Sequence, residues 1–295
     1  MRVHDDPALF GASINYTMAS TGFLPGLIEK DYFCTLLLEF LATENDTLVF
    51  KGGTCLAKVH TDFYRLSEDL DFSIPTPVAA TRSERSRRAA KLKASLLTID
   101  QRQPVFHTVH KLTGENNSTQ YSAVVGYRSL VTRQEESIKI QAGLREPLFM
   151  PSVKAPARTL LLDPVSDQPM MEPIMVQCLA VQEAFAEKFR AALSRRDAAV
   201  RDFYDIAYAV GNAGIKPDVD EFIELVRHKL TVPGNEPIDI SEDRFIAVRR
   251  QVATQLKPVL RSKDFAAFDL EWALGLAVKM ALKVSGGASE SSSRP

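Results

Sequence analysis

The sequence predicts an α+β protein in which a short mixed sheet flanked by helices is followed by a mainly helical C-terminal region. Two observations favour this class. Short apolar or alternating stretches in the first half are typical of strands, and helical spacing dominates from Val176 onward. The chain has 295 residues, of which 45% are hydrophobic and 25% charged, as in globular proteins. A chain of this length usually divides its core, so we expect two domains.

A Pro-rich stretch at residues 163–173 is the expected domain boundary. We therefore expect a core with an N-terminal helix over residues 1–165 and a helical domain over residues 166–284. Residues 285–295 contain mainly Gly, Ser and Glu, which offer nothing to pack. This last segment is predicted to be a disordered tail.

The first half begins with a core helix and a buried strand. Residues 27–41 repeat Leu and Phe at helical spacing and form a broad apolar face. The run 47–50 is short, apolar and β-favouring, and it stops at Gly52 and Gly53. This pattern predicts a strand that ends in a tight turn, with a helix following over residues 54–60.

The next segment has the alternation of a half-buried strand. Within residues 69–74, Asp69 and Asp71 share one face with Ser73, whereas apolar side chains occupy the other face. Further along, we expect a basic helix over 81–97 and strands over 121–130 and 136–144. Helices are expected over 176–195, 200–212, 218–230, 241–256 and 265–283.

The charge balance excludes a general cationic field for gripping nucleic acid. Lys and Arg total 36 and Asp and Glu total 37, so the formal net charge is -1 and any nucleic-acid site must be a local patch. Asp5 and Asp6 stand where a signal peptide would need basic and apolar residues. No stretch approaches the ~18 apolar residues of a membrane span. We therefore expect a cytoplasmic protein that does not contact a membrane.

Cysteines and histidines predict no soft-metal site. Cys34, Cys55 and Cys178 are widely separated and form no CxxC pair, so neither a disulfide framework nor a thiolate zinc site is supported. His107 and His110 are three residues apart, but their apolar neighbours indicate a strand or loop without a third ligand. A reducing compartment fits this usage of cysteine.

The most informative segment pairs a glycine turn with two aspartates. Two glycines after a strand let the backbone approach a ligand, and the N–H groups that follow, with the Thr54 hydroxyl, form a cradle for phosphate. Asp69 and Asp71 aim two carboxylates at one point, where hard oxygen ligands suit Mg²⁺ held jointly with substrate phosphates. Gly-Gly-Thr alone is more often a simple turn, and a lone Asp-x-Asp is usually a solvated strand face. Together they favour two-metal phosphoryl transfer.

These motifs resemble those of the AbiEii/AbiGii and MenT toxins, members of the DNA polymerase β-like nucleotidyltransferase superfamily. The resemblance rests on Phe50-Lys51-Gly52-Gly53-Thr54, Arg65-Leu66-Ser67-Glu68-Asp69-Leu70-Asp71-Phe72, Ile28-Glu29-Lys30-Asp31-Tyr32, Glu187-Lys188-Phe189 and Arg201-Asp202-Phe203-Tyr204-Asp205. These blocks are scattered over residues 25–210. The resemblance implies a polymerase β-like core and a helical domain that closes the cleft.

The resemblance also implies roles for individual residues. The nucleotide would be bound by Gly52, Gly53, Thr54, Ser67 and Lys188, Mg²⁺ would be held by Asp69 and Asp71, and Asp205 would complete the active site. Lys58, one turn beyond the cradle, either reaches a phosphate or is solvated. An alternative for Lys188 and Asp205 is that they exchange charges with Arg201 and Glu187, which would stabilise little.

Gln141 departs from the family pattern. Relatives tend to have Ile-Lys-Ile-Glu where this chain has Ile138-Lys139-Ile140-Gln141, and the glutamate often deprotonates the attacking hydroxyl. A neutral amide neither accepts that proton nor binds metal as strongly as a carboxylate. We expect that Asp205 or water takes this role, that the alignment differs here, or that activity is altered or lost.

A local basic segment is the candidate RNA-binding surface. The segment 81–95 carries six basic residues and one acidic residue, and the C-terminal region is acidic, so charge is segregated as a phosphate-backbone footprint requires. A solvated helix face is the alternative. The candidate RNA-binding residues are Arg82, Arg85, Arg87, Arg88 and Lys91.

The resemblance supplies the substrate class. MenT-like toxins transfer nucleotides from NTP to the 3′ end of tRNA, which stops translation, and a cognate antitoxin counteracts them. We therefore expect an Mg²⁺-dependent toxin nucleotidyltransferase whose partners are NTP, tRNA and an antitoxin protein. The alternatives are transfer to a protein, including the antitoxin, or to a small molecule, and a catalytically silent module that binds RNA or a partner.

Overall fold

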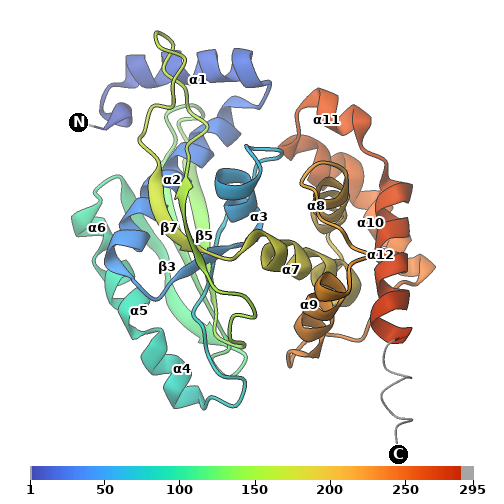
Figure 1. Cartoon of the computed structure of the whole chain (residues 1–295). Coiled ribbons are helices and arrows are strands. Elements are labelled where there is room, and N and C mark those ends of the chain that lie inside the picture. The colour runs from blue at the N-terminus through green and yellow to red at the C-terminus, as the bar shows by residue number, and fades with distance from the viewer. Residues whose placement is uncertain (1, 287–295) are drawn as a thin grey trace, which may run out of the picture. The chain divides into compact units, whose positions relative to one another are not determined.

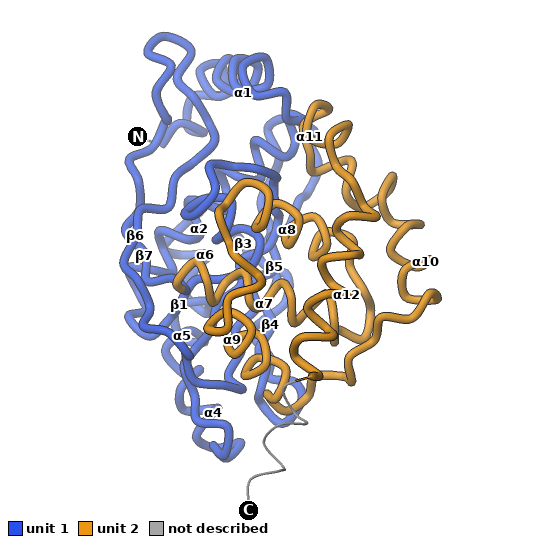
Figure 2. The backbone as a smooth tube through the Cα atoms, turned by 45° about the vertical axis from the view of Figure 1, so that its right-hand side comes forward, with its two compact units in different colours: residues 1–179 blue, residues 180–295 orange. Residues whose placement is uncertain are grey.

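The computed structural model describes residues 2–286 (Figure 1). The chain divides into two compact units, Met1–Leu179 and Ala180–Pro295 (Figure 2). This division differs from the boundary expected after residue 165, because the strand that precedes residue 180 pairs within the sheet of the first unit. Of the expected tail, Ser285 and Gly286 end the last helix, and the remainder lies outside the described residues.

A seven-stranded mixed sheet forms the centre of the first unit. Its order is β3-β4-β5-β2-β1-β7-β6. The strands are β1 (Val49–Lys51), β2 (Leu70–Ser73), β3 (Phe106–Glu115), β4 (Gln120–Arg128), β5 (Glu135–Gly143), β6 (Val153–Ala157) and β7 (Ile174–Cys178). β2 pairs with β5, and β1 with β7, in parallel, whereas the other pairs are antiparallel. The expectation of a short mixed sheet is thus confirmed.

Strands β6 and β7 were not expected from the sequence. Val176 to Cys178 belong to β7, so the helix expected from residue 176 is wrong at its start, and α7 begins at Val181. β6 contains Pro156, which lacks an N–H, and it lies at the edge of the sheet, where a missing donor is tolerated. A run of five residues that includes Pro gives little strand signal in the sequence.

Helices flank this sheet. They are η1 (Val3–Asp5), α1 (Pro7–Thr21), α2 (Pro25–Glu44), α3 (Gly52–Cys55), the π-helical turn η2 (Leu56–His60), α4 (Arg82–Arg88), α5 (Ala90–Leu97) and α6 (Ile99–Arg102). α2 is buried on most of its surface, because it packs against α1, α5 and β7. Phe33 of α2 stacks on Tyr127 of β4 with ring centroids 4.2 Å apart. The predicted core helix is therefore confirmed, and it is fixed to the sheet by aromatic contact.

The second unit consists of helices. They are α7 (Val181–Ser194), α8 (Val200–Gly211), α9 (Asp220–Thr231), α10 (Glu242–Gln251), η3 (Val252–Leu256), η4 (Lys257–Val259), α11 (Ser262–Ala267) and α12 (Leu270–Gly286). α7 packs against α8, α9 and α12, with Phe189 edge-on to Phe222 at 5.5 Å between ring centroids. The helix expected over 265–283 is interrupted before α12, where the Asp269 carboxylate accepts the Trp272 N–H. Within the described residues, no helix is both long and apolar enough to cross a membrane.

Candidate active site

A left-handed turn at Gly52 opens the site. Gly52 follows β1 and has a φ of +76°, a conformation that favours glycine. A Cβ at this position would lie 2.3 Å from Asp71 Oδ2 and 2.9 Å from Asp71 Cβ. Lys51 and Asp71 are direct partners in the β1–β2 ladder. The structure therefore brings the glycine turn and the second aspartate together, and only glycine leaves room for that carboxylate.

Gly53 passes beneath two polar side chains of the second motif. A Cβ on Gly53 would lie 2.5 Å from Arg65 Nη2 and 3.0 Å from Ser67 Oγ. The Arg65 side chain is buried, donates Nη1–H to the Leu66 carbonyl at 3.1 Å and packs on the Tyr64 ring. Arg65 begins the motif that contains Asp69 and Asp71, but the sequence alone predicts no role for it. A guanidinium beside the cradle is suited to an anionic ligand.

Thr54 connects the cradle to the backbone of the first aspartate, Asp69, through a hydrogen bond. Its hydroxyl donates to the backbone carbonyl of Asp69 at 2.5 Å, and the residue is buried. The Thr54 hydroxyl therefore joins the cradle to the segment that carries Asp69. From the sequence, this hydroxyl is predicted to be an additional hydrogen-bond donor to phosphate. The main-chain N–H of Thr54 is the group that fits the expected phosphate contact.

Asp71 lies on the accessible side of β2, and Asp69 directly precedes this strand, so the strand expected from residue 69 begins one residue later. Leu70 and Phe72, which alternate with them, are buried on the other side. Asp69 is exposed and Asp71 is half-buried, so both residues have access to solvent, and the Asp71 carboxylate lies against the Gly52 backbone. Two carboxylates on one strand face are suitable donors for a hard divalent cation such as Mg²⁺.

Gln141 occupies the strand position next to Asp71. In the parallel β2–β5 ladder, Asp71 is the direct partner of Gln141. This register places the amide at the position where the resemblance to the family implies a third carboxylate. The neutral side chain contributes no negative charge and no proton acceptor of carboxylate strength.

The Glu29-Lys30-Asp31 block supports the site through contacts with other segments of the chain, a role that the sequence does not predict. Glu29 is buried and accepts hydrogen bonds from the N–H groups of Leu130 and Val131 at 2.6 and 3.1 Å. Lys30 Nζ lies 3.0 Å from Glu68 Oε2, next to the first aspartate of the pair. One helix turn thus fixes segments that are far apart in the chain. The only sequence signal is that three charged residues interrupt an apolar helix.

Asp31 completes this block by pairing with Lys58. Lys58 is fully buried, and its Nζ lies 2.6 Å from Asp31 Oδ1 and 2.7 Å from the Thr35 hydroxyl. Asp31 Oδ2 also accepts the Leu160 N–H at 2.8 Å. The two alternatives for Lys58, a phosphate ligand and a solvated lysine, are both wrong, because its ammonium donors are directed to α2.

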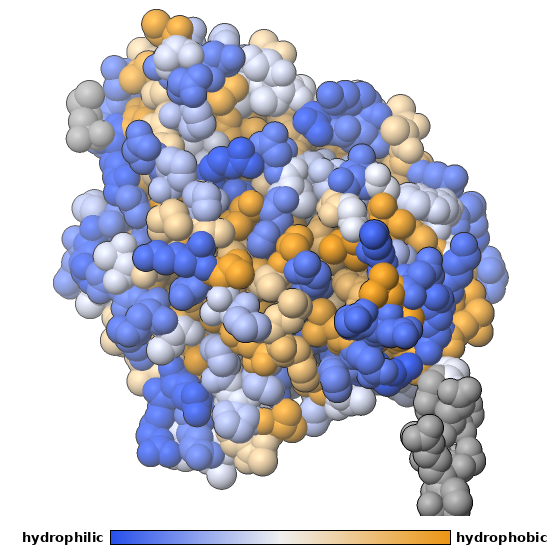
Figure 3. Space-filling model, in the orientation of Figure 1, coloured by the Kyte–Doolittle hydropathy of each residue, from blue (hydrophilic) through white to orange (hydrophobic). Residues whose placement is uncertain are grey.

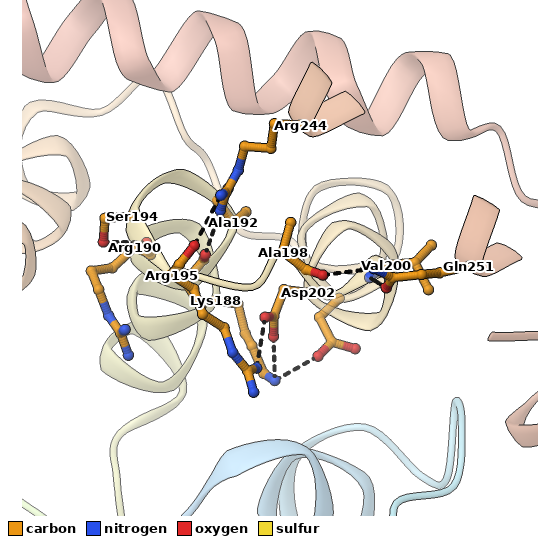
Figure 4. A network of polar contacts seen from close by, with 12 residues as sticks. Lys188, Arg190, Ala192, Ser194, Arg195, Ala198, Val200, Asp202, Arg244 and Gln251 are labelled. Atoms are coloured by element: carbon orange, nitrogen blue, oxygen red, sulfur yellow. Dashed lines mark hydrogen bonds and ion pairs between the residues drawn. The ribbon is translucent and has the colours of Figure 1, made fainter. Parts of the chain in front are cut away.

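A second charged network surrounds Lys188 in the helical unit (Figure 4). Lys188 Nζ lies 3.0 Å from Asp202 Oδ1 and 2.9 Å from Asp205 Oδ2. Both carboxylates are buried, whereas 14% of the Lys188 side chain is exposed. Arg195 Nη1 lies 3.4 Å from the other oxygen of Asp202. The two aspartates of the Arg-Asp-x-x-Asp motif therefore hold the lysine of the preceding motif.

The other side of α7 carries a separate ion cluster. Lys229 Nζ lies 2.7 Å from Glu183 Oε1 and 3.2 Å from Glu187 Oε1. Arg201 donates its Nε–H to the Gln255 carbonyl at 3.1 Å. Lys188 thus exchanges charge with Asp202 and Asp205, and Glu187 and Arg201 have other partners.

Arg244 fixes the C-terminal end of α7. Its buried guanidinium donates to the carbonyls of Ala192 and Arg195 at 2.8 and 2.9 Å (Figure 4). A cation at this end of a helix satisfies carbonyl groups that lack intrahelical partners. The contact holds the helix that carries Lys188.

The basic segment becomes α4 and α5, with a break at Ala89. Arg85 is buried and donates to the carbonyls of Leu144 and Val78, both at 3.1 Å, so it is unavailable for RNA contact. Lys91 is exposed and pairs with Asp46 at 2.7 Å. Arg82, Arg87 and Arg88 are exposed. The face around α4 in Figure 3 is correspondingly hydrophilic.

His107 and His110 lie on β3. Both are exposed, and His107 Nε2 lies 3.6 Å from Glu135 Oε2. Among the residues that the structure describes, no group of three metal-binding side chains includes either histidine.

Comparison with known proteins gives a family match over most of the chain. The family model described as nucleotidyl transferase AbiEii toxin, Type IV TA system, matches residues 35–274. No curated protein matches the chain in sequence. JHP933 from Helicobacter pylori is similar in structure with 14% identity and a TM-score of 0.49, covering 92% of this chain and 96% of that one. A second H. pylori protein, whose description proposes a nucleotidyltransferase, has 13% identity and a TM-score of 0.49, covering 88% and 95%.

Proposed function

Because the chain belongs to the AbiEii family of nucleotidyltransferase toxins of type IV toxin–antitoxin systems, we propose that it transfers a nucleoside monophosphate from an NTP to the 3′ end of tRNA. The modified tRNA can no longer be aminoacylated, so translation stops. A cognate antitoxin is the expected protein partner. This proposal extends the family activity, nucleotidyl transfer, to a specific acceptor.

The observation that carries the proposal is the contact between Gly52 and Asp71. The left-handed glycine leaves no room for a side chain beside Oδ2, so the cradle backbone and the aspartate pair lie in one small region. Thr54 adds a hydrogen bond to the Asp69 carbonyl. A triphosphate seated on the cradle would therefore lie next to Asp69 and Asp71.

The residues present fit a divalent cation bound together with the nucleotide. Asp69 and Asp71 would hold Mg²⁺, which when bound supplies positive charge against the phosphate oxygens. Gly53 and Thr54 would donate main-chain N–H groups to the triphosphate, with Arg65 and Ser67 above Gly53. These groups neutralise and orient the nucleotide, which is most of what phosphoryl transfer requires.

The chemical step is a displacement at the α-phosphorus. The terminal hydroxyl oxygen of the acceptor forms the new bond to phosphorus, and the bond to the pyrophosphate oxygen breaks. The hydroxyl loses its proton, and pyrophosphate leaves. Gln141 does not accept this proton and Asp205 is engaged with Lys188, so we assign its removal to water.

Lys188 is proposed to contact a nucleotide phosphate. Its ammonium is oriented by two buried aspartates, yet part of the side chain is exposed. A lysine held in this way presents a fixed positive charge without a large rearrangement. The exposed arginines of α4, Arg82, Arg87 and Arg88, are proposed to contact tRNA phosphates.

The test is to incubate the protein with Mg²⁺, total tRNA and each α-labelled NTP in turn. We expect label on the tRNA band with at least one NTP, and no label when the tRNA 3′ end has been oxidised to a dialdehyde. Label on a protein band with none on tRNA would refute the tRNA acceptor and identify a protein acceptor.

Asp71→Asn tests the aspartate pair in the same assay. The substitution keeps the size of the side chain but removes its charge, and we expect transfer to fall by about 10³-fold or more. Asp62→Asn is the matched control, because Asp62 is exposed and belongs to the same unit. Full activity of Asp71→Asn would exclude the proposed metal-binding role.

A further inference from the structure

Two cysteines and a histidine that are distant in sequence meet beneath the cradle. The ligand atoms of Cys55, His60 and Cys178 all lie within 4.8 Å of one another. Both cysteines are buried, and His60 is half-buried. From the sequence, a thiolate zinc site is not supported because the cysteines are widely separated. The fold brings Cys178 close to Cys55, because Cys178 of β7 pairs with Phe50 of β1, and β1 leads into the cradle.

The His60 ring is already oriented for a metal ligand. Its Nε2 lies 3.0 Å from the Leu179 carbonyl oxygen, which can only accept a hydrogen bond. In the neutral ring, Nε2 therefore carries the proton and Nδ1 carries the lone pair. Metal-binding histidines typically donate their second N–H to a carbonyl or carboxylate in this way, which fixes the tautomer and the ring plane.

The environment also favours a thiolate. A hydrogen bond with Cys55 lowers the pKa of the Cys178 thiol, and a hydrogen bond with His60 lowers it further, against the effect of burial. Thiolates are the form in which cysteine binds metals. Cys34, the third cysteine, differs because burial raises the pKa of its thiol to about 12.

We propose that Cys55, His60 and Cys178 form a binding site for a thiophilic divalent cation of the zinc class. Two sulfur donors and one imidazole are a common ligand set for zinc, and three protein ligands leave one position for water or an external ligand. This site is separate from Asp69 and Asp71, whose hard oxygen donors select a different kind of cation.

The third ligand favours a metal site over a disulfide. A bond between Cys55 and Cys178 would leave the oriented His60 without a role. Formation of that bond would also need an oxidant to take two electrons. Metal binding needs only the release of the thiol protons.

The position of the site gives the cation a structural consequence. Cys55 directly follows Thr54, and His60 ends η2, so two ligands bracket the turn after the cradle. Cys178 is on β7, next to β1. A bound cation would tie residues 55–60 to the sheet and hold the cradle in place.

Cobalt is the most direct probe, since Co²⁺ bound by thiolate gives a charge-transfer band in the near ultraviolet. Titration of the reduced full-length protein with Co²⁺ should produce this band at one equivalent, and Zn²⁺ should abolish it. Native mass spectrometry should show one Zn²⁺ per chain, removable by a chelator. Zinc should raise the Tm by roughly 5 °C when it is in large excess over its Kd.

Variants distinguish this site from other ligands. Cys178→Ser should weaken the charge-transfer band by half or more, and His60→Gln, at a half-buried position, should bind Co²⁺ at least tenfold more weakly. Cys34→Ser and His110→Gln are the matched controls and should bind as the unaltered protein does. Circular dichroism establishes that each variant is folded. Absence of a thiolate band in the folded protein, an unchanged band in Cys178→Ser, or an unchanged Co²⁺ affinity in His60→Gln would overturn the proposal.

Discussion

Two buried lysine–aspartate clusters, one in each unit, look alike in sequence but differ in geometry. Lys58 is fully buried and its ammonium is shared among one carboxylate, a hydroxyl and carbonyl oxygens. Lys188 lies between two carboxylates, and part of its side chain is exposed. The first cluster joins secondary-structure elements. The second leaves part of the lysine side chain accessible to solvent.

The difference shows that the packing around a lysine, and not its place near a motif, decides how far its side chain is accessible to solvent. A buried ion pair is costly to break because the remaining charge is left without a partner or water. A partly exposed lysine keeps contact with water, and we propose that Lys188 binds an incoming phosphate in this way. We expect substitutions at the two positions to affect different properties.

Breaking the first cluster should have the largest effect. Lys58→Met removes the partner of Asp31 in the core, and we expect the free energy of unfolding to fall by roughly 3–5 kcal/mol. Chemical denaturation measures this change. The double variant Lys58→Met with Asp31→Asn should recover much of the stability and should keep transfer activity. A double variant that is stable but inactive would show that Lys58 takes part in the reaction.

Breaking the second cluster should mainly reduce the rate. We expect Lys188→Met to lower the turnover of nucleotidyl transfer by about 10²–10³-fold, with a smaller loss of stability than Lys58→Met. The assay with labelled NTP measures the rate. Adding Asp205→Asn to Lys188→Met should restore stability without restoring transfer. Recovery of transfer in that double variant would assign Lys188 to folding alone.

A substitution at Gln141 tests whether transfer is limited by the lack of a carboxylate that accepts the proton of the attacking hydroxyl. Gln141→Glu places a carboxylate beside Asp71 in the β2–β5 ladder, and we expect transfer to increase by about tenfold as the pH rises above the pKa of the new group. Gln134→Glu, at an exposed position before β5, is the control. A decrease in rate would mean that the amide itself positions the acceptor.

The arginines of α4 repeat the contrast between buried and exposed cations on a smaller scale. Arg87→Gln should weaken tRNA binding and lower the slope of log K against log salt by about one, because one phosphate contact is lost. Arg85→Gln should instead reduce stability, since it breaks hydrogen bonds to the Leu144 and Val78 carbonyls. Binding at several salt concentrations measures the first effect. An unchanged slope in Arg87→Gln would remove this residue from the RNA-binding surface.

The smallest expected effect concerns His4, whose ring contributes to the pH dependence of stability. Burial lowers the pKa of His4 below its ordinary value of 6.5, against the opposing effect of Asp5. The unfolded chain therefore binds a proton more readily, so this contribution to stability is present above pH 6.5 and is lost as the pH falls through the folded pKa. Denaturation between pH 7 and pH 5 should show a shallower decline for His4→Gln. An identical pH dependence in the variant would exclude this contribution.

Much of the fold of the first unit could be predicted, because local patterns agree with the tertiary structure there. The run ending at Gly52, the alternation around Asp69 and Asp71 and the apolar helix within α2 all appear in the sequence. β6 and β7 could not be predicted, because short strands acquire their identity from their pairing partners.

The candidate site divides in the same way. The glycine turn and the aspartates carry local signals, and the structure places them in contact. The burial of Lys58 and Arg85 depends on what packs against them, and no spacing reveals it. The cluster of Cys55, His60 and Cys178 depends on β7 lying beside β1, a pairing between distant segments.

The contacts of helix α2 with later segments of the chain determine when the site can assemble during synthesis. Asp31 accepts a hydrogen bond from Leu160, 129 residues later, and Glu29 accepts one from Leu130. β1, which leads into the cradle, is completed on one side by β7 at Ile174–Cys178. A nascent chain therefore cannot assemble the cradle and its supports until residue 178 has left the ribosome. We therefore expect the cradle to form only after β7 at Ile174–Cys178 has been synthesised.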